Sequence, residues 1–464
     1  MANSFDVIIL GGGPAGYVCA VRASQLGLST ALIERDKLGG VCVNVGCIPS
    51  KALLHAAYVA NLVRRDARTL GVIATDVAFD LGAAVKHSRR AAEQNSKGVG
   101  FLMKKHGVTV IAGDGVVQPD RKVVVDGTTY TATKGLVLAT GTRVKGLPQL
   151  DLVLDGERVI STNEALFLER VPASIAIIGA GPVGCEFADV LSAFGSRVTL
   201  IEMLPQILPL EDHEAAEALA KSFKKRKIDM LVAAKVTGAK VDKDGVTLDV
   251  EAEGIAKSAD VEVVLVAAGR ALNTSGNGFE DAGVQLTPQG FVQVDDHLRS
   301  TADGVYAIGD IAGPPMLAHK GSREGIFVAE LIAGQTPHPI RYDNIPSVTY
   351  CHPEVASVGF TERQCQEKNL EFTIGRFPFS ANGRARASLE TEGFVKIIRD
   401  AQYGEILGAH VVASHASELI HEIVVARENE YTVEELDLAV HAHPTLSEAV
   451  AEAALDSLGR ALNI

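Results

Sequence analysis

Two stretches of the chain carry the same pattern at the same spacing. In each, a short apolar run leads into a glycine turn of the form G-x-G-x-x-G, and a second apolar run follows and ends in a glutamate. The residues are Gly11, Gly13, Gly16 and Glu34 in the first stretch, and Gly179, Gly181, Gly184 and Glu202 in the second. The separation from first glycine to glutamate is identical, so the chain contains one structural unit twice.

The residue types in this unit match what a dinucleotide requires. The glycines allow a tight turn and a close approach of the backbone to a pyrophosphate, which the N-terminus of the following helix binds. A carboxylate at the end of the second strand takes a ribose hydroxyl. A lone glycine triplet is weak evidence, whereas two complete units in register predict two dinucleotide sites.

Glu202 also indicates which nucleotide the second site takes. A carboxylate at this position pairs with a free 2′-hydroxyl and repels a 2′-phosphate, for which an arginine would be needed. Residues 203–208 contain no basic side chain. We therefore expect NAD rather than NADP in the second site.

The rest of the sequence favours an α/β fold around these two units. The composition is 47% hydrophobic but 5% aromatic, which suits closely packed helices and sheets. Residues 55–106 have the pattern of helices, whereas residues 347–412 alternate apolar and polar side chains as antiparallel strands do, with glycines such as Gly359 and Gly375 as breaks. Helices are expected from there to the end of the chain.

Two cysteines near the first unit form the clearest chemical signal. Cys42 and Cys47 lie among glycines, and Pro49 follows at a position that the first turn of a helix accepts. A helix that starts here lowers the pKa of the Cys47 thiol and favours the reactive thiolate. A disulfide across this spacing requires a distorted turn, for which Gly46 provides the freedom. Two unrelated buried cysteines are the alternative.

A second chemical signal lies near the end of the chain. His443 is followed by Pro444 and, five residues after the histidine, by Glu448. A carboxylate at this spacing can orient an imidazole and raise its basicity, as general acid–base catalysis needs. The alternative is a pair of surface histidines, His441 and His443, at a loop–helix junction.

Charge and composition exclude several classes of function. A net charge of −13 argues against a nucleic-acid binder, and no apolar run is long enough to cross a membrane. The cysteine spacing matches no zinc site, so no metal is expected. The N-terminus lacks a basic targeting segment, which indicates a cytoplasmic protein or a trimmed organellar one. The acidic residues after position 415 form a solvated face or a surface for a basic partner.

Taken together, these motifs resemble the flavin-dependent pyridine nucleotide–disulfide oxidoreductases along essentially the whole chain. The resemblance rests on the two dinucleotide units, the cysteine stretch at 38–51, Ala-Ile-Gly-Asp ending at Asp310, and His-Pro-Thr-x-x-Glu ending at Glu448. Residues 315–320 and 441–449 are most similar to the members that reoxidise lipoyl groups. One turn differs from the sequence that is common in the family, because residues 270–273 lack the usual proline.

The resemblance implies two Rossmann-like domains, one for FAD and one for NAD, plus a C-terminal α+β dimerisation domain. The expected segments are residues 1–145 for the FAD domain, 146–271 for the NAD domain, 272–341 for a central segment returning to the FAD domain, and 342–464 for the interface domain. It also implies a homodimer, in which His443 acts on the cysteine pair of the other subunit.

The implied site residues extend the motifs already described. The implied catalytic residues are Cys42, Cys47, His443 and Glu448, with Cys47 nearer the flavin. The implied cofactor-binding residues are Gly11, Gly13, Gly16, Glu34, Lys51, Gly115, Thr140, Gly141, Gly179, Gly181, Gly184, Glu186, Glu202, Gly269, Asp310 and Ala318. In the family, the residue matching Lys51 lies beside the flavin ring and pairs with an acid matching Glu186.

The implied partners are lipoyl domains and the core subunit of a 2-oxo-acid dehydrogenase complex, or the glycine cleavage lipoyl protein. The nearest alternatives within the family are glutathione reductase and mercuric reductase. Glu202 disfavours their NADPH, and no cysteine follows Cys365 as a mercury enzyme would need. A non-catalytic flavin redox sensor is an alternative from another class, but it would need neither the cysteine pair nor the histidine–glutamate pair.

Overall fold

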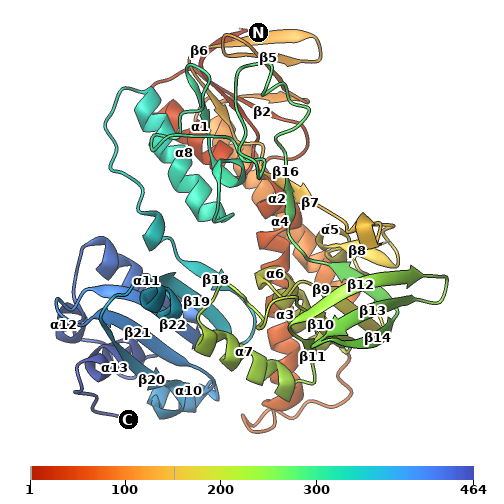
Figure 1. Cartoon of the computed structure of the whole chain (residues 1–464), viewed down its shortest axis with the longest axis vertical. Helices are drawn as coiled ribbons and strands as arrows, with labels where there is room; N and C mark the ends of the chain where they lie inside the picture. Colours follow the sequence, from red (N-terminus) through yellow and green to blue (C-terminus); the bar gives the residue numbers. More distant parts are fainter. Residues whose placement is uncertain (1–2, 151) are drawn as a thin grey trace. The chain divides into compact units, whose positions relative to one another are not determined.

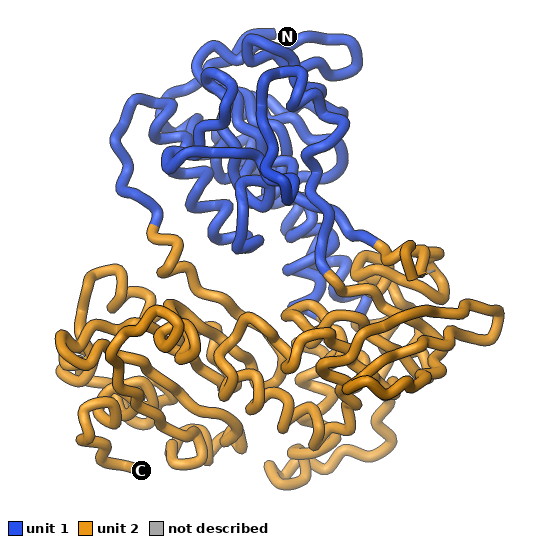
Figure 2. Tube along the Cα trace, in the orientation of Figure 1, with its two compact units in different colours: residues 1–52, 85–145, 269–340 blue, residues 53–84, 146–268, 341–464 orange. Residues whose placement is uncertain are grey.

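The computed structural model describes residues 3–150 and 152–464. The chain divides into two compact units, each assembled from three separate segments (Figure 2). The first unit contains residues 1–52, 85–145 and 269–340, and the second contains residues 53–84, 146–268 and 341–464. Over the described residues, no helix combines the length and the apolar character needed to cross a membrane.

The first unit is built on a seven-stranded sheet with the order β3-β2-β1-β6-β5-β4, in which β17 also pairs with β6. The strands are β1 (Ser4–Leu10), β2 (Thr30–Glu34), β3 (Thr109–Ala112), β4 (Val116–Gln118), β5 (Lys122–Val125), β6 (Thr128–Leu138) and β17 (Val305–Ala307). The pairs of β1 with β2 and β6 are parallel, and Val7, Ile8 and Ile9 are fully buried. Apolar runs of this kind form central strands because both faces are covered.

Two helices cover this sheet and carry residues of the predicted site. Helix α1 (Pro14–Gln25) follows the first glycine turn, and α8 (Ala318–Ile332) lies beside it (Figure 1). Their backbones approach closely, because a Cβ placed on Gly325 would lie 2.5 Å from the Ala15 carbonyl oxygen. A short ribbon of β7 (Thr142–Val144) and β16 (Arg270–Leu272) completes this unit, with the 3₁₀ turn η2 (Gly309–Ala312) after β17.

The second unit repeats the arrangement in a five-stranded sheet of order β11-β10-β9-β15-β8. Its parallel strands are β8 (Val159–Ser161), β9 (Ser174–Ile178), β10 (Arg197–Ile201), β11 (Asp229–Leu231) and β15 (Val263–Val266). Further elements are α5 (Thr162–Ala165), α6 (Pro182–Phe194), α7 (His213–Lys225) and the antiparallel β12 (Ala234–Val241), β13 (Val246–Ala252) and β14 (Ile255–Val261). The predicted repeat is therefore present as two sheets of the same design.

The C-terminal part of the second unit is an antiparallel sheet of order β18-β19-β22-β21-β20, as the alternating pattern predicted. Its strands are β18 (Ser347–Thr349), β19 (Glu354–Gly359), β20 (Phe372–Pro378), β21 (Phe394–Asp400) and β22 (Ile406–Ala413). The helices are α9 (Glu362–Glu367), α10 (Gly383–Ser388), α11 (Ala416–Glu428), α12 (Val433–Leu438) and α13 (Glu448–Ser457).

The prediction of a break at Gly375 is wrong, because this residue lies inside β20. A Cβ placed on Gly375 would lie 1.9 Å from the Ala453 carbonyl oxygen of α13. The glycine is therefore needed for the close packing of a helix on the strand rather than for a turn. Helix α13 packs across this sheet and buries Val450 and Ala454 completely.

The helical prediction for residues 55–106 is correct at both ends and wrong in the middle. Helix α3 (Cys47–Arg65) and helix α4 (Leu81–Lys105) are separated by turns and irregular chain over residues 66–80. This connection contains apolar side chains such as Ile73, so its composition resembles that of a helix. These side chains are exposed and form no buried face, so they do not indicate a helix.

Candidate functional site: two nucleotide turns and a cysteine pair

The two glutamates that end the repeated units make the same hydrogen bonds. Glu34 Oε2 accepts from the Gly12 amide at 2.6 Å, and Glu202 Oε2 accepts from the Ala180 amide at 2.8 Å. The other carboxylate oxygens accept from the Asp36 and Leu204 amides, at 2.8 and 2.9 Å. Each carboxylate is therefore fixed against the glycine turn of its own unit, which is where a ribose would lie.

The glycines of the two turns test whether a dinucleotide fits. A Cβ placed on Gly16 would lie 1.9 Å from the Gly11 carbonyl oxygen, and one placed on Gly184 would lie 1.9 Å from that of Gly179. By contrast, the Cβ position of Gly13 has no other atom within 4 Å, and the same holds at Gly181. The third glycine thus permits helix packing, and the second leaves open space where a pyrophosphate can approach the backbone.

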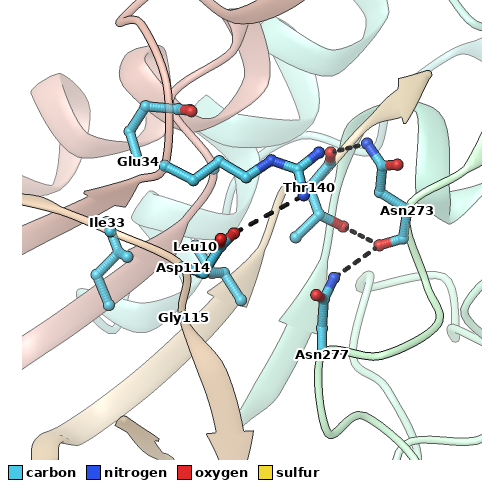
Figure 3. A pocket seen from close by; sticks show the side chains of 11 residues that line it. Leu10, Ile33, Glu34, Asp114, Gly115, Thr140, Asn273 and Asn277 are labelled. Carbon is cyan, nitrogen blue, oxygen red and sulfur yellow. Dashed lines mark hydrogen bonds and ion pairs between the residues drawn. The ribbon is translucent and has the colours of Figure 1, made fainter. Parts of the chain in front are cut away.

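An open pocket lies at the carboxyl ends of the strands in the first unit (Figure 3). Four of the predicted residues line it: Gly11, Glu34, Gly115 and Thr140. The Thr140 hydroxyl donates to the Asn273 carbonyl oxygen at 2.7 Å, and the Asn273 amide group donates back to the Thr140 carbonyl oxygen at 2.9 Å. The pocket wall is therefore stabilised by a reciprocal pair of hydrogen bonds.

Sequence reasoning missed four polar residues of this pocket: Arg35, Asp114, Asn273 and Asn277. Arg35 Nη1 lies 3.8 Å from Asp114 Oδ1, and Asn277 Nδ2 donates to the Asn273 carbonyl oxygen at 3.1 Å. Asn273 belongs to the turn at residues 270–273 that lacks the family's usual proline. This difference was the sequence feature that could have drawn attention to Asn273. Arg35 adjoins the predicted Glu34, whereas Asp114 and Asn277 stand in loops without a recognisable pattern.

The cysteine pair spans a break between two helices. Helix α2 (Gly40–Val45) ends at Gly46, and α3 begins at Cys47, as the sequence predicted. A Cβ placed on Gly46 would lie 2.9 Å from the Val41 carbonyl oxygen, so a larger residue would disturb the break. Both cysteines are partly buried. The break brings their side chains within hydrogen-bond reach.

The two cysteine side chains lie in different surroundings. A hydrogen bond to Cys47, burial, and the negative charge of Cys47 raise the pKa of Cys42 well above its ordinary value, although the charge of Lys51 acts in the opposite direction. Ionisation of Cys42 is therefore disfavoured in these surroundings. Cys47 is the first residue of α3, where unpaired amides and the helix dipole stabilise a thiolate.

Asp310 belongs to a hydrogen-bonded chain in the first unit. The Thr142 hydroxyl donates to Asp310 Oδ2 at 2.7 Å and accepts from Arg270 Nε at 2.7 Å. Burial lowers the pKa of Arg270, while the charges of Asp310 and Cys47 raise it. Arg270 was not predicted to belong to the site, yet its guanidinium lies within electrostatic reach of both the predicted carboxylate and the predicted thiolate.

The histidine near the C-terminus is oriented as its motif predicted. His443 Nδ1 lies 2.8 Å from Glu448 Oε1, and Glu448 Oε2 accepts from the Thr445 amide at 2.7 Å. Burial tends to raise the pKa of Glu448, but the hydrogen bonds from Thr445 and His443 hold it below its ordinary value. The imidazole is 79% exposed, so Nε2 is accessible to a thiol from outside the chain.

The remaining predicted residues are distributed over both units. Lys51 belongs to the first unit and Glu186 to the second, so their pairing stays a prediction. Glu186 is buried and accepts from the Tyr350 amide at 3.1 Å. Gly141 and Gly269 adopt positive φ angles of 64° and 93° in the first unit, and Ala318 begins α8 there.

The fold and site define a disulfide oxidoreductase with two dinucleotide-binding domains. The model of the pyridine nucleotide-disulphide oxidoreductases matches residues 5–325, and that of their dimerisation domain matches residues 345–454. The chain belongs to this family, which confirms the predicted fold class and resemblance. It is an NAD-dependent flavoprotein oxidoreductase, as the family's use of FAD and NAD(H) requires.

Individual relatives match over nearly the whole chain. Dihydrolipoyl dehydrogenase 1 from mitochondria of Arabidopsis thaliana is 42% identical over 99% of this chain and 91% of its own length. Dihydrolipoyl dehydrogenase of Chlorobaculum tepidum is also 42% identical, over 99% of this chain and 98% of its own. Among solved structures, LpdA from Mycobacterium tuberculosis has a TM-score of 0.89 at 31% identity and covers 98% of this chain and 99% of its own.

A second solved structure is the HOCl-induced flavoprotein disulfide reductase RclA from Escherichia coli, which has a TM-score of 0.85 at 25% identity. It covers 97% of this chain and 99% of its own. The fold therefore serves disulfide reductases of different biological roles, and the choice among substrates depends on the site.

Proposed function

We propose that this chain oxidises protein-bound dihydrolipoyl groups to lipoyl groups and reduces NAD⁺ to NADH. The observation that carries the proposal is the arrangement of Cys42 and Cys47 across the break at Gly46, which brings the two side chains within hydrogen-bond reach and places Cys47 at the start of α3. A pair of thiols in this arrangement can form a disulfide that accepts two electrons from a dithiol. The relatives that bear the name dihydrolipoyl dehydrogenase support the choice of substrate.

The thiol chemistry proceeds by disulfide exchange. His443, oriented by Glu448, removes a proton from one dihydrolipoyl thiol, and the resulting thiolate attacks the Cys42 sulfur of the Cys42–Cys47 disulfide. Cys47 leaves as a thiolate while a mixed disulfide forms. The second substrate thiol then attacks the substrate sulfur, closes the lipoyl ring and releases Cys42. Two electrons have passed to the cysteine pair.

FAD, when held in the first unit, would supply the two-electron redox chemistry that links the cysteine pair to NAD⁺. Within the first unit, Gly11, Gly13, Gly16 and Glu34 form the turn that would hold FAD, with Asp310 and the pocket around Thr140 completing its site. Lys51 balances the charge of Cys47 as that thiolate forms. In the second unit Glu202, which is held by the Ala180 amide, would accept from the NAD ribose hydroxyl and would repel a 2′-phosphate.

The assembly we propose is a homodimer that serves a larger complex. The dimerisation-domain match at residues 345–454 supports the dimer. In it, His443 of one subunit acts on the cysteine pair of the other, which agrees with the high exposure of its imidazole. The partners are lipoyl domains with the core subunit of a 2-oxo-acid dehydrogenase complex, or the lipoyl protein of glycine cleavage.

The proposal is tested by comparing two substrate pairs on the purified protein. We expect dihydrolipoamide with NAD⁺ to yield NADH, and glutathione disulfide with NADPH to give no turnover. Turnover with the second pair alone would favour a glutathione-type reductase. A protein that binds FAD but turns over neither pair would favour a redox sensor.

A further inference from the structure

A buried ion pair in the first unit lies next to the predicted cofactor site. Lys320 and Glu324 follow each other by one turn on α8, and each side chain is 1% exposed. Lys320 Nζ lies 3.1 Å from Glu324 Oε1. Removing two charges from water costs free energy, and a well-packed apolar pair in such a place is often at least as stable. A contribution to stability alone therefore does not explain these residues.

The pair holds both backbone polar atoms of Gly309. Lys320 Nζ donates to the Gly309 carbonyl oxygen at 3.0 Å, and Glu324 Oε2 accepts from the Gly309 amide at 2.7 Å. Lys320 also donates to the Gly313 carbonyl oxygen at 2.7 Å, so the ammonium has three oxygen partners. One ammonium and one carboxylate thus hold both ends of the turn η2.

The turn and the helix can approach this closely because α8 has a glycine, Gly321, next to Lys320. A Cβ placed on Gly321 would lie 3.2 Å from the Gly309 Cα and 3.0 Å from the Ala15 Cβ. Gly309 itself has a φ of +73°, a conformation that side-chain-bearing residues rarely adopt. The backbone of this turn is therefore held in one unusual conformation by side chains of α8.

We propose that Lys320 and Glu324 are positioning residues for the flavin site. The Gly309 carbonyl belongs to the peptide group that joins Gly309 to Asp310. The hydrogen bond from Lys320 therefore fixes the orientation of this peptide group and, with it, the direction of the Asp310 side chain. Asp310 in turn accepts from the Thr142 hydroxyl. The inference rests on the proposed binding of FAD in the first unit, and it names the residues that hold Asp310 in place for a cofactor hydroxyl.

The first test measures the affinity of the apoprotein for FAD by quenching of flavin fluorescence. Lys320→Met keeps a side chain of similar size but removes both hydrogen bonds to the turn and the ion pair with Glu324, and we expect FAD to bind about tenfold or more weakly. Glu324→Gln retains an acceptor for the Gly309 amide and should weaken FAD binding less. The affinity of the second unit for NAD⁺ should stay unchanged in both variants.

The matched control is Lys396→Met in the second unit. Lys396 is also 1% exposed and contacts three carboxylates, those of Asp212, Glu214 and Glu362, at 2.9, 3.0 and 2.8 Å. Its replacement removes a buried ammonium without touching Gly309, so it should lower thermal stability and leave FAD affinity as in the wild type. Equal loss of FAD affinity in Lys320→Met and Lys396→Met would overturn the inference.

A double-mutant cycle separates positioning from general damage. If Lys320 acts through Asp310, FAD affinity in Lys320→Met/Asp310→Asn should be no lower than in the weaker-binding single variant. Additive losses would contradict a positioning role, as would wild-type FAD affinity in Lys320→Met. If Lys320→Met does not fold, Glu324→Gln with Asp310→Asn provides the same cycle. Failure of the wild-type protein itself to bind FAD would instead refute the proposed function.

Discussion

The Nδ1 atom of His443 lies 2.8 Å from Oε1 of Glu448, whose other oxygen is held by the Thr445 amide. The carboxylate is held at both oxygens and orients the imidazole through Nδ1, while the His443 side chain stays exposed. This arrangement supplies a base for a thiol that arrives from another molecule.

Replacing His443 tests this role. In His443→Gln we expect FAD content to be normal and oxidation of dihydrolipoamide to be slower by about 10²-fold or more, because general-base help is lost. His421→Gln, on an exposed histidine of α11 that contacts the Ser417 carbonyl, is the control and should keep its rate. A near-normal rate in His443→Gln would remove this residue from the mechanism.

The unequal thiols predict different spectra for the two cysteine variants. Because Cys47 lies at the start of α3, where helix amides favour a thiolate, Cys47→Ser should lose the long-wavelength thiolate–flavin absorption on two-electron reduction. Cys42→Ser should retain that absorption while losing disulfide exchange. Persistence of the band in Cys47→Ser would reverse the assignment of the two sulfurs.

Glu202 should determine the choice of pyridine nucleotide. In Glu202→Gln the side chain can still accept from the Ala180 amide, but the negative charge that repels a 2′-phosphate is gone. We expect the ratio of kcat/KM for NAD⁺ over NADP⁺ to fall about tenfold. An unchanged ratio would mean that another residue discriminates between the two nucleotides. Glu202→Ala removes the hydrogen bond to the Ala180 amide as well as the charge, so its ratio shows the combined effect of both losses.

The second unit contains a histidine–carboxylate pair whose contribution to stability should depend on pH. His352 Nε2 lies 3.1 Å from Glu390 Oε2. The Tyr58 hydroxyl donates to the other carboxylate oxygen, Glu390 Oε1, at 3.1 Å. Burial opposes the charged imidazole and Arg226 repels it, but Glu390 and Asp189 prevail and raise the pKa of His352 above 6.5. The stabilisation is therefore complete below that value and is lost as the pH rises through the folded-state pKa.

Glu390→Gln should accordingly lower the free energy of unfolding more at about pH 5.5 than at about pH 9. The measurement is urea unfolding of both proteins at the two pH values, with Glu392→Gln, on a carboxylate paired with Lys225, as the control. An equal loss at both values would show that the pair does not carry a pH-dependent charge.

Much of the architecture could be predicted from local patterns. The parallel strands, the glycine turns and the start of α3 at Cys47 depend on short-range chemistry, since apolar runs, positive φ angles and helix ends are determined within a few residues. The same rules failed at Gly375, where a long-range contact with Ala453 decides the residue type. Composition likewise could not place the loop at residues 66–80.

The parts of the site that sequence reasoning missed come from distant segments. Arg270 reaches Asp310 through Thr142, and Lys320 reaches the turn at Gly309 across the packing of α8. Although Lys320 ends the 315–320 stretch used for the resemblance, its contact with the turn was not foreseen, because a buried cation and an exposed one look alike in sequence until the fold brings their partners together.

The central claim is that a dihydrolipoyl dithiol delivers its electrons to the Cys42–Cys47 disulfide. It is tested most directly by alkylating the oxidised protein under anaerobic conditions before and after addition of dihydrolipoamide, and identifying the labelled peptides by mass spectrometry. We predict that the segment at residues 38–51 gains two alkyl groups on reduction and loses this reactivity when NAD⁺ is added. A segment that stays unlabelled after dihydrolipoamide, or that is fully labelled before it, would contradict the account.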